Sequence, residues 1–337
     1  MSRLPIGRCP MRVLMVTTEW PRAPWGTAQF VARQAAFLRA AGIEVEVFQF
    51  HGQGNPINYA RAWLDVQRLL SQKHFDLVHA QFGQSALLAL PKRVPLVVTF
   101  RGDDLQGILD DQNGRITMSG RILRRFSRTV AHLADAVIVV SPHMQPYVQN
   151  GKPIHVIPSG IDLELFRPQD RAAARARLGL PTDERLVLFV GNPELARKRF
   201  SLAQQAVDRL PAEQQARLVV CWLVPHTQIP DYMAACDALV FTSVQEGSPN
   251  AVKEALACDL PVVSVPVGDV AERLRGIAGC ALCADDRPET VAAALARVLE
   301  RRTRVDGRSA VRQLDEHLLT QKVIGIYHGV LNGRVQS

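Results

Sequence analysis

Short apolar segments alternate with amphipathic ones along this chain of 337 residues, and the alternation comes in two series. Strand-like segments occupy 12–18, 43–50, 75–80, 94–100, 136–141 and 153–159 in the first series, and 185–191, 217–224, 238–243 and 261–265 in the second. Helix-like segments separate them, and this order predicts parallel sheets covered by helices. We expect an α/β fold of two Rossmann-like, doubly wound parallel-sheet domains that face each other across a cleft.

The region between the two series, 158–181, contains glycine and prolines and is predicted to be a connector with a short helix. We place the first domain at residues 1–165 and the second at 166–319. The C-terminal helix, 320–337, is expected to pack back onto the first domain, and the residues before Met11 are expected to form a short tail. A hydrophobic content of 47% suits two cores of medium size.

The composition and the motifs of the sequence exclude several classes of protein. No apolar run is long enough to span a bilayer. The cysteines fall mostly in apolar elements, which is typical of reduced thiols in the cytoplasm, and Cys280–Cys283 is predicted to be a strand and its exit rather than a metal site. The net charge of +8 favours anionic ligands or an acidic lipid surface, but no nucleic-acid-binding module is present. No G-x-G-x-x-G follows the first strand, so a nicotinamide dehydrogenase is not expected.

The residues that could bind a ligand or take part in a reaction follow the predicted strands. Doubly wound sheets bind ligands at the carboxyl ends of their strands. The strand exits carry Gly26, Arg101, Ser141, Ser159, Gly191 and Glu246. We therefore expect these residues to lie around the cleft.

The most specific segment lies between Glu246 and Glu254. Ser248 is predicted to cap a helix and Pro249 to open its first turn, so that the free N–H groups form a phosphate site. The two carboxylates that flank this site accept hydrogen bonds from hydroxyl groups. A ligand with phosphate at its centre and hydroxyl-rich groups at both ends, such as a nucleotide sugar, matches this arrangement.

The sequence Glu246-Gly-Ser-Pro-Asn-x3-Glu254 resembles the paired-glutamate signature of the retaining glycosyltransferases of family 4, which have the GT-B fold. The resemblance also covers 154–168 and 232–240, and extends over nearly the whole chain. It implies that Glu246 meets the transferred sugar and Glu254 the ribose of the donor. The intervening residues would complete the donor loop: Gly247, Ser248, Pro249 and Asn250.

The segment from Gly191 to Arg199 is the second one that the resemblance makes informative. A basic helix start on the surface is the ordinary interpretation of its charges. The family places a lysine and an arginine on the donor diphosphate here, which implies that role for Lys198. Asn192 stands where the family usually has that arginine, and it can donate hydrogen bonds but supplies no charge. Without the arginine, the diphosphate would depend more on Lys198, on Arg197 beside it and on the helix start at Ser248. Gly26 matches a family position near the donor phosphates.

Two further departures concern Arg101 and Ser159, which stand where relatives usually have histidine and asparagine. In relatives that histidine lies near the reacting sugar. Arg101 cannot act as a base, but it could hold a phosphate, an acidic acceptor or Asp103. The resemblance implies no metal site, since no acidic pair has the Asp-x-Asp spacing, and no cofactor beyond the nucleotide sugar, which is UDP- or GDP-linked.

The expected function is the transfer of a sugar, with retention of configuration, to a glycan or lipid-linked glycan in surface polysaccharide or glycolipid synthesis. An epimerase or phosphorylase of the same fold, or a binding subunit without activity, remains an alternative. Four arginines mark the predicted helix 115–134: Arg121, Arg124, Arg125 and Arg128. They form either a solvated face or a contact with anionic membrane, which would place a cytoplasmic enzyme at the inner face of the plasma membrane.

Overall fold

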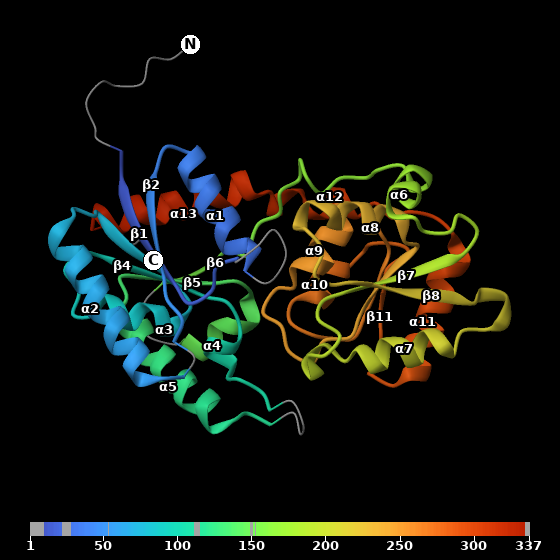
Figure 1. Ribbon diagram of the computed structural model, residues 1–337, viewed down its shortest axis with the longest axis horizontal. Helices are drawn as coiled ribbons and strands as arrows, with labels where there is room; N and C mark the ends of the chain where they lie inside the picture. The colour runs from blue at the N-terminus through green and yellow to red at the C-terminus, as the bar shows by residue number, and fades with distance from the viewer. Residues whose placement is uncertain are drawn as a thin grey trace, which may run out of the picture.

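The computed structural model describes residues 10–21, 28–52, 54–110, 115–148, 151 and 153–333. The first sheet contains β1 (Arg12–Thr17), β2 (Glu44–Gln49), β3 (Leu77–Gln81), β4 (Leu96–Phe100), β5 (Ala136–Val139) and β6 (Ile154–Val156). The second contains β7 (Arg185–Val190), β8 (Ala216–Cys221), β9 (Ala238–Phe241), β10 (Val262–Ser264) and β11 (Ala281–Leu282). Figure 1 shows the two series as separate halves.

Both sheets are parallel in every described pairing and have the crossovers of doubly wound domains. Their orders are β2-β1-β3-β4-β5-β6 and β11-β10-β9-β7-β8. Every predicted strand is present, and β11 lies within the segment predicted from Cys280 to Cys283. The strands end earlier than the apolar runs, so that Ser141 and Ser159 lie in the loops beyond them.

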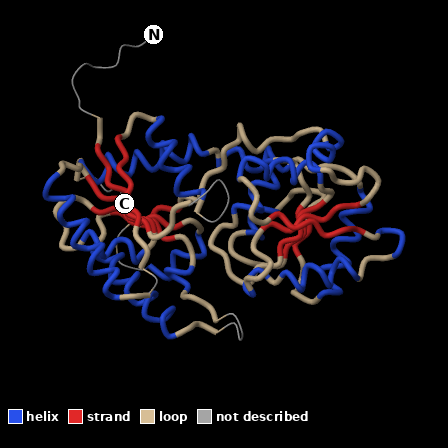
Figure 2. Tube along the Cα trace, viewed as in Figure 1, coloured by secondary structure: helices blue, strands red, loops and turns tan. Residues whose placement is uncertain are grey.

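Helices cover both faces of each sheet, as Figure 2 shows for the strands (red) and the helices (blue). In the first half they are α1 (Gln29–Ala40), α2 (Pro56–Gln72), α3 (Gly83–Ala86), α4 (Asp103–Gln106) and α5 (Met118–Leu133). In the rest of the chain they are α6 (Arg171–Leu178), α7 (Phe200–Asp208), α8 (Ile229–Ala235), α9 (Asn250–Ala257), α10 (Val270–Leu274), α11 (Pro288–Arg301), α12 (Gly307–Val311) and α13 (Glu316–Leu331). No described helix combines the length and the apolar character needed to cross a bilayer.

The cores show why the chain crosses between the halves twice. Val187, Leu239 and their neighbours form the core of the second half. One face of the first sheet is covered by α1 together with α13, whose Val323 and Tyr327 are almost fully buried there. The connector from β6 to β7 is the first crossing, and the chain returns to the first half through α13 (Figure 1).

The connector is held by local signals that the sequence displays. The side chain of Asp170 caps α6 by accepting from the N–H of Ala173 at 2.7 Å. Gly179, with φ of 62°, ends the helix in the left-handed conformation. A parallel bridge joins Ile161 to Asp315, so the connector runs beside the start of α13. Both crossings therefore meet at one place, next to the cleft.

Candidate active site

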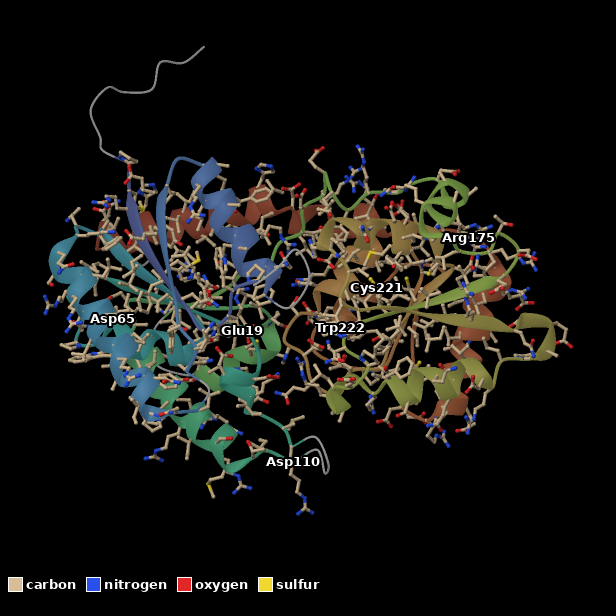
Figure 3. The ribbon with its side chains drawn as sticks, viewed as in Figure 1. Glu19, Asp65, Asp110, Arg175, Cys221 and Trp222 are labelled. Atoms are coloured by element: carbon tan, nitrogen blue, oxygen red, sulfur yellow. The ribbon has the colours of Figure 1, made fainter. Side chains whose placement is uncertain are left out.

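A cavity of about 480 Å³ lies between the halves, at the carboxyl ends of both sheets. Figure 3 shows Glu19 of the first half and Trp222 of the second near the middle of the molecule, where the halves meet, and both line this cavity. The lining also includes Phe30, Arg33, Arg101, Gly191, Asn192, Arg197, Lys198, His226, Glu246, Gly247, Pro249, Asn250 and Glu254. The predicted cleft is thus present, and most of the predicted site residues line it.

The loop that joins β9 to α9 lies close to the loop after β4 and to the loop after β10. A Cβ atom at Gly247 would lie 2.3 Å from the carbonyl oxygen of Arg101, in the opposite half. Gly268 has φ of 55°, and a Cβ there would lie 2.9 Å from the carbonyl oxygen of Gly247. Because only glycine fits at these two positions, they set how closely the loop approaches its neighbours.

The prediction that Ser248 caps the following helix is wrong. The helix begins at Asn250, Pro249 occupies the N-cap position, and no side chain caps it. The hydroxyl of Ser248 donates instead to Asp269 at 2.8 Å. Asp269 is 3% exposed and also accepts from Arg273 at 2.7 Å, so its buried carboxylate requires these donors. The first turn of α9 consequently keeps its N–H groups without a capping side chain.

Asn250 is the first residue of α9 and lines the cavity. Its Oδ1 atom is buried and has no hydrogen-bond partner among the described residues. A buried acceptor without a partner costs roughly 1–3 kcal/mol. A hydroxyl or N–H group of a bound ligand would satisfy it.

Lys198 and Glu246 form the central ion pair of the cleft. The Nζ atom of Lys198 lies 2.5 Å from Oε1 of Glu246, and Nη1 of Arg197 lies 4.0 Å from the same oxygen. Thr242, just after β9, donates from its hydroxyl to the carbonyl of Lys198 at 2.8 Å, and Val244 donates to the carbonyl of Arg197 at 2.9 Å. Backbone contacts therefore fix the two cations beside the loop that carries Glu246.

Gly191 and Asn192 follow β7 and shape the turn that carries those cations. Gly191 has φ of 139°, and a Cβ there would lie 3.6 Å from the Lys198 side chain. Oδ1 of Asn192 accepts from the N–H of Glu194 at 3.0 Å. The asparagine thus tightens the turn with its oxygen, while the positive charge at this side of the cleft comes from Arg197 and Lys198.

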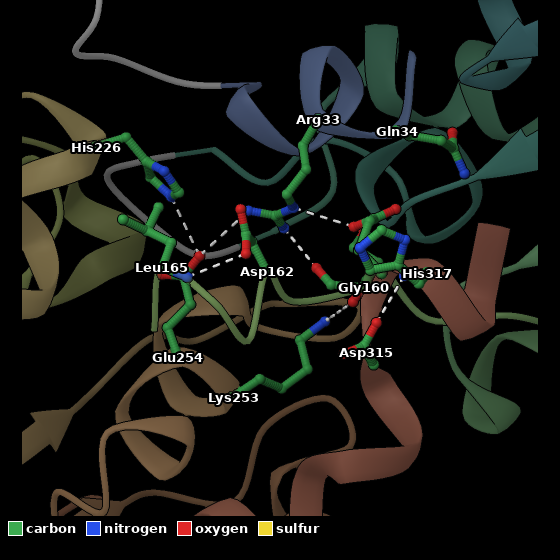
Figure 4. A network of polar contacts seen from close by, with 12 residues as sticks. Arg33, Gln34, Gly160, Asp162, Leu165, His226, Lys253, Glu254, Asp315 and His317 are labelled. Carbon is green, nitrogen blue, oxygen red and sulfur yellow. Dashed lines mark hydrogen bonds and ion pairs between the residues drawn. The ribbon is translucent and has the colours of Figure 1, made fainter. Parts of the chain in front are cut away.

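Glu254, on α9, is 4% exposed and is surrounded by basic groups. Nε2 of His226 lies 3.3 Å from its Oε1 atom, and Nη1 of Arg33 lies 3.7 Å from the same oxygen. Figure 4 shows His226 and Arg33 converging on this carboxylate. Burial raises the pKa of Glu254, but the hydrogen bond from His226 and the charges of Arg33 and Lys253 outweigh it and hold the pKa below its usual value. Glu254 is therefore an ionised hydrogen-bond acceptor.

Arg33 links three parts of the chain beneath Glu254. Its Nη2 atom donates to the carbonyl of Gly160 at 2.5 Å, and its Nε to Glu316 at 3.0 Å. Lys253, beside Glu254 on α9, donates from Nζ to the carbonyl of Ser159 at 2.7 Å. Helices α1, α9 and α13 and the connector thus meet in one buried polar network (Figure 4).

Arg101 follows β4 and lines the first half of the cleft. Its guanidinium donates to Gln81, Gln34 and Ser159 rather than to Asp103, so the interpretation that it holds Asp103 is wrong. Asp104 instead accepts from backbone N–H groups, those of Gly83, Arg101 and Gly102. Burial raises the pKa of Asp104 to about 6 in spite of these bonds.

Among the lining residues that the sequence analysis missed, four carry polar or charged groups that could contact a ligand: Glu19, Arg33, Trp222 and His226. Glu19 and Trp222 follow β1 and β8, so the rule that ligands bind at strand exits would have included them. Burial in the cleft and the nearby charge of Asp103 raise the pKa of Glu19. Arg33 and His226 carry no local signal, because their partners lie far away along the chain.

Gly26, the residue predicted to lie near the donor phosphates, is outside the described part of the chain. Within the described ranges, no group of three or more histidine, cysteine, aspartate or glutamate side chains is placed to hold a metal ion.

Two family models match the chain. The one described as Glycosyltransferase Family 4 matches residues 24–165, and the one described as Glycosyl transferases group 1 matches residues 220–301. The putative teichuronic acid biosynthesis glycosyltransferase TuaC of Bacillus subtilis (strain 168) is 32% identical over 219 residues, which are 58% of this chain and 54% of TuaC. The D-inositol 3-phosphate glycosyltransferase 1 of Catenulispora acidiphila is 29% identical over 254 residues, 61% of this chain and 59% of that protein. The chain thus spans somewhat more than half the length of these relatives.

Solved structures agree with the architecture. The sucrose-phosphate synthase (tll1590) of Thermosynechococcus elongatus superposes with a TM-score of 0.83 at 18% identity, covering 96% of this chain and 100% of that one. Anabaena HepE in complex with UDP and glucose superposes with a TM-score of 0.70 at 19% identity, covering 95% and 100%. Two facing parallel-sheet halves with a cleft at their carboxyl ends define the GT-B fold. Within that fold, part of the first half matches the family 4 glycosyltransferase model and part of the second half matches the group 1 model.

Proposed function

We propose that the protein transfers a sugar from a nucleotide diphosphate sugar to an acceptor hydroxyl with retention of configuration. The second half would hold the donor and the first half the acceptor. One observation carries the proposal: Glu246 and Glu254 both line one cavity, on either side of the uncapped first turn of α9. This arrangement offers hydroxyl acceptors around an anion site, as a nucleotide sugar requires.

In the proposed complex, Glu254 accepts a hydrogen bond from the ribose and Glu246 from the transferred sugar. Lys198 and Arg197 face the diphosphate together with the N–H groups at the start of α9. The orphaned oxygen of Asn250 accepts from the donor. Asn192 stands at the position of the family's arginine but is uncharged, and its oxygen closes its own turn. The second cation at the diphosphate is therefore assigned to Arg197.

The reaction that this site supports is substitution on one face of the sugar. The bond from the anomeric carbon to the diphosphate oxygen breaks, and the acceptor oxygen bonds to the same carbon on the same face. The leaving phosphate oxygen takes the proton of the acceptor hydroxyl. Lys198 and Arg197 stabilise the charge that develops on this oxygen; for comparison, removing one donor fixed at a developing oxyanion typically costs roughly 2.7–4 kcal/mol. Closure of the cleft excludes water, which would otherwise hydrolyse the donor.

UDP is the first nucleotide to test, because HepE, with the same fold, has been solved with UDP and glucose. Calorimetric titration with UDP-, GDP- and ADP-sugars should identify one tight donor. Glu254→Ala should weaken it by about 1.5–3 kcal/mol, the cost of a charged hydrogen bond. Glu300→Ala, an exposed glutamate on α11, serves as the control and should change nothing. Failure of every donor to bind would contradict the proposal and favour a binding subunit without activity.

The stereochemistry has its own test. Proton NMR of the first product formed should show the anomeric configuration of the donor. Inversion, or turnover of the donor without any acceptor, would contradict a retaining transferase.

We further propose that the acceptor is a glycan or lipid-linked glycan at an anionic membrane surface, contacted through α5. Met118, Ile122 and Phe126 form an apolar stripe on this helix and are 70%, 51% and 49% exposed. The exposed arginines Arg121, Arg125 and Arg128 lie beside it, whereas Arg124 packs over Tyr147. An exposed apolar stripe with adjacent arginines is the pattern of a helix that lies in a membrane interface. This would place the enzyme in the cytoplasm, peripheral to the inner face of the plasma membrane.

Flotation with vesicles that contain anionic lipid tests this contact. Arg121→Glu combined with Arg125→Glu should abolish flotation, since each basic residue near such a surface contributes about 1 kcal/mol. The matched control changes the exposed Arg301 and Arg302 of the second half to glutamate and should leave flotation intact. Equal loss in both double variants would mean that only net charge matters.

A further inference from the structure

The guanidinium of Arg101 is fixed in one orientation on the wall of the cleft. Nε and Nη2 donate to Oε1 of Gln81 at 3.0 and 2.6 Å, and Nη1 donates to the hydroxyl of Ser159 at 2.7 Å. Nη2 also reaches Oε1 of Gln34 at 3.1 Å. The ring of Phe30 covers one face of the group, at 4.5 Å from the guanidinium carbon. A long, flexible side chain is thereby made rigid.

Every one of these partners is neutral. Within the described ranges, no carboxylate lies within ion-pair distance of Arg101, although glutamates at positions 34 and 81 would have the same shape as the glutamines and would neutralise it. The two glutamine side chains also bond each other, from Nε2 of Gln81 to Oε1 of Gln34 at 2.9 Å. The site is therefore built to orient a cation and to leave its charge uncompensated.

Holding the charge in this way has an energetic cost. Burial lowers the pKa of Arg101 to about 10, and the more distant carboxylates of Glu316, Asp104 and Glu19 offset only part of this effect. The group stays protonated at neutral pH. Arg101 is partly buried. A cation withdrawn from water without a paired anion is unfavourable, and an anion that binds beside it offsets the cost.

The position of Arg101 says which substrate would carry that anion. Its backbone carbonyl is the group that Gly247 approaches, so Arg101 lies directly across from the loop of Glu246. Both residues line the same cavity. The inference rests on the proposed function in one respect, because Glu246 marks where the transferred sugar lies.

We infer that Arg101, oriented by Gln34, Gln81 and Ser159, binds a negatively charged group, a carboxylate or a phosphate, that is carried by a sugar substrate of the enzyme. The charged sugar is either the transferred sugar of the donor or the acceptor. Its anionic group supplies the counter-charge that the protein withholds.

Matched pairs of ligands distinguish these two sources by calorimetry. The donor pairs are UDP-glucuronate against UDP-glucose and GDP-mannuronate against GDP-mannose. The acceptor set is methyl glucuronide, glucose 6-phosphate and methyl glucoside, measured with and without UDP. We expect the charged member of one set to bind about tenfold or more tightly than its neutral partner, as a charged hydrogen bond predicts.

The variants show whether Arg101 is responsible. Arg101→Gln should abolish the preference for the charged ligand, whereas Arg101→Lys, which keeps the charge, should retain part of it. Arg197→Gln is the matched control, because this cation faces the same cavity from the second half. Arg197→Gln should weaken the binding of charged and neutral nucleotide sugars by the same factor and leave the preference for the charged ligand unchanged. Thermal unfolding confirms that each variant is folded.

The inference is overturned if neither set shows a preference, or if Arg101→Gln retains one. It is also overturned if Arg197→Gln abolishes the preference equally, since the discrimination would then be general electrostatics. Failure of all nucleotide sugars to bind contradicts the proposed function instead, and the acceptor set measured without UDP then decides the inference by itself.

Discussion

The Nζ atom of Lys198 lies 2.5 Å from Oε1 of Glu246, so the cation proposed to hold the donor diphosphate is paired with the carboxylate proposed to hold the sugar. Both side chains are largely buried, at 18% and 15% exposure. A ligand that places phosphate between the halves competes with Glu246 for this cation. The pair thus links donor binding to the position of Glu246.

Glu246→Gln separates the two roles. The amide releases Lys198, so UDP alone should bind as tightly as in the wild type or more tightly. Turnover should fall about 100-fold or more, because the sugar loses a charged acceptor in the transition state. Calorimetry with UDP and steady-state kinetics check the two halves of this prediction. A parallel loss of UDP affinity would mean that Glu246 holds the nucleotide.

Gly247 is expected to tolerate no side chain. In Gly247→Ala the new Cβ would lie 2.3 Å from the Arg101 carbonyl, so the halves could not approach as they do here. Turnover should fall at least about tenfold, since closure assembles the site. Gly325→Ala is the control: it lies in α13 with open space around it, and alanine should stabilise that helix by about 0.5–1 kcal/mol. Full activity of Gly247→Ala, measured as kcat, would show that the close approach is dispensable.

The sequence predicted the architecture because parallel strands buried on both faces leave continuous apolar runs, such as 96–100 and 185–190. It also predicted that Glu246, Lys198 and Glu254 lie around the cleft, because the turn after β7, the loop after β9 and helix α9 all stand at the carboxyl end of the second sheet. It misplaced the cap at Ser248, since Asp269, twenty-one residues later, takes that hydroxyl. Local propensity could not foresee a buried carboxylate that arrives from another strand exit.

The contacts that involve the connector and α13 could not be predicted from the sequence either. Arg33 is an ordinary basic residue of an amphipathic helix until folding brings it to Glu316, 283 positions away. Arg101 and Ser159 could be recognised singly as departures from the family, but the hydrogen bond between them depends on how the loops after β4 and β6 meet. Such pairs are set by tertiary packing rather than by any pattern within one segment.

Lys253 should make stability depend on pH. Burial lowers its pKa to about 7, against an ordinary value of 10.5. Between these values the unfolded chain binds a proton that the folded protein does not, so the contribution of this residue to stability rises with pH. Below pH 7 both states are protonated, and the folded state bears the full penalty of a buried charge.

Comparison with Lys253→Met isolates this effect. The melting temperature of the wild type, relative to that of the variant, should rise between pH 7 and pH 9. The other titrating groups are common to both proteins and cancel in the difference. A difference that stays constant over this range would show that Lys253 remains charged in the fold, paired with the Ser159 carbonyl.

The buried pair of Arg33 and Glu316 is expected to be strongly coupled, because the two side chains are only 8% and 4% exposed. Arg33→Met leaves the carboxylate buried without its cation and should lower the free energy of unfolding by roughly 3–5 kcal/mol. Adding Glu316→Gln removes the orphaned charge and should restore a large part of that loss. The matched surface pair, Arg12 and Glu44 at 37% and 55% exposure, should give a coupling below about 1 kcal/mol. Urea unfolding of the two double-mutant cycles measures both couplings. Equal values would mean that the network beneath Glu254 is as well solvated as the surface, and that α13 is attached to the first half by its apolar face alone.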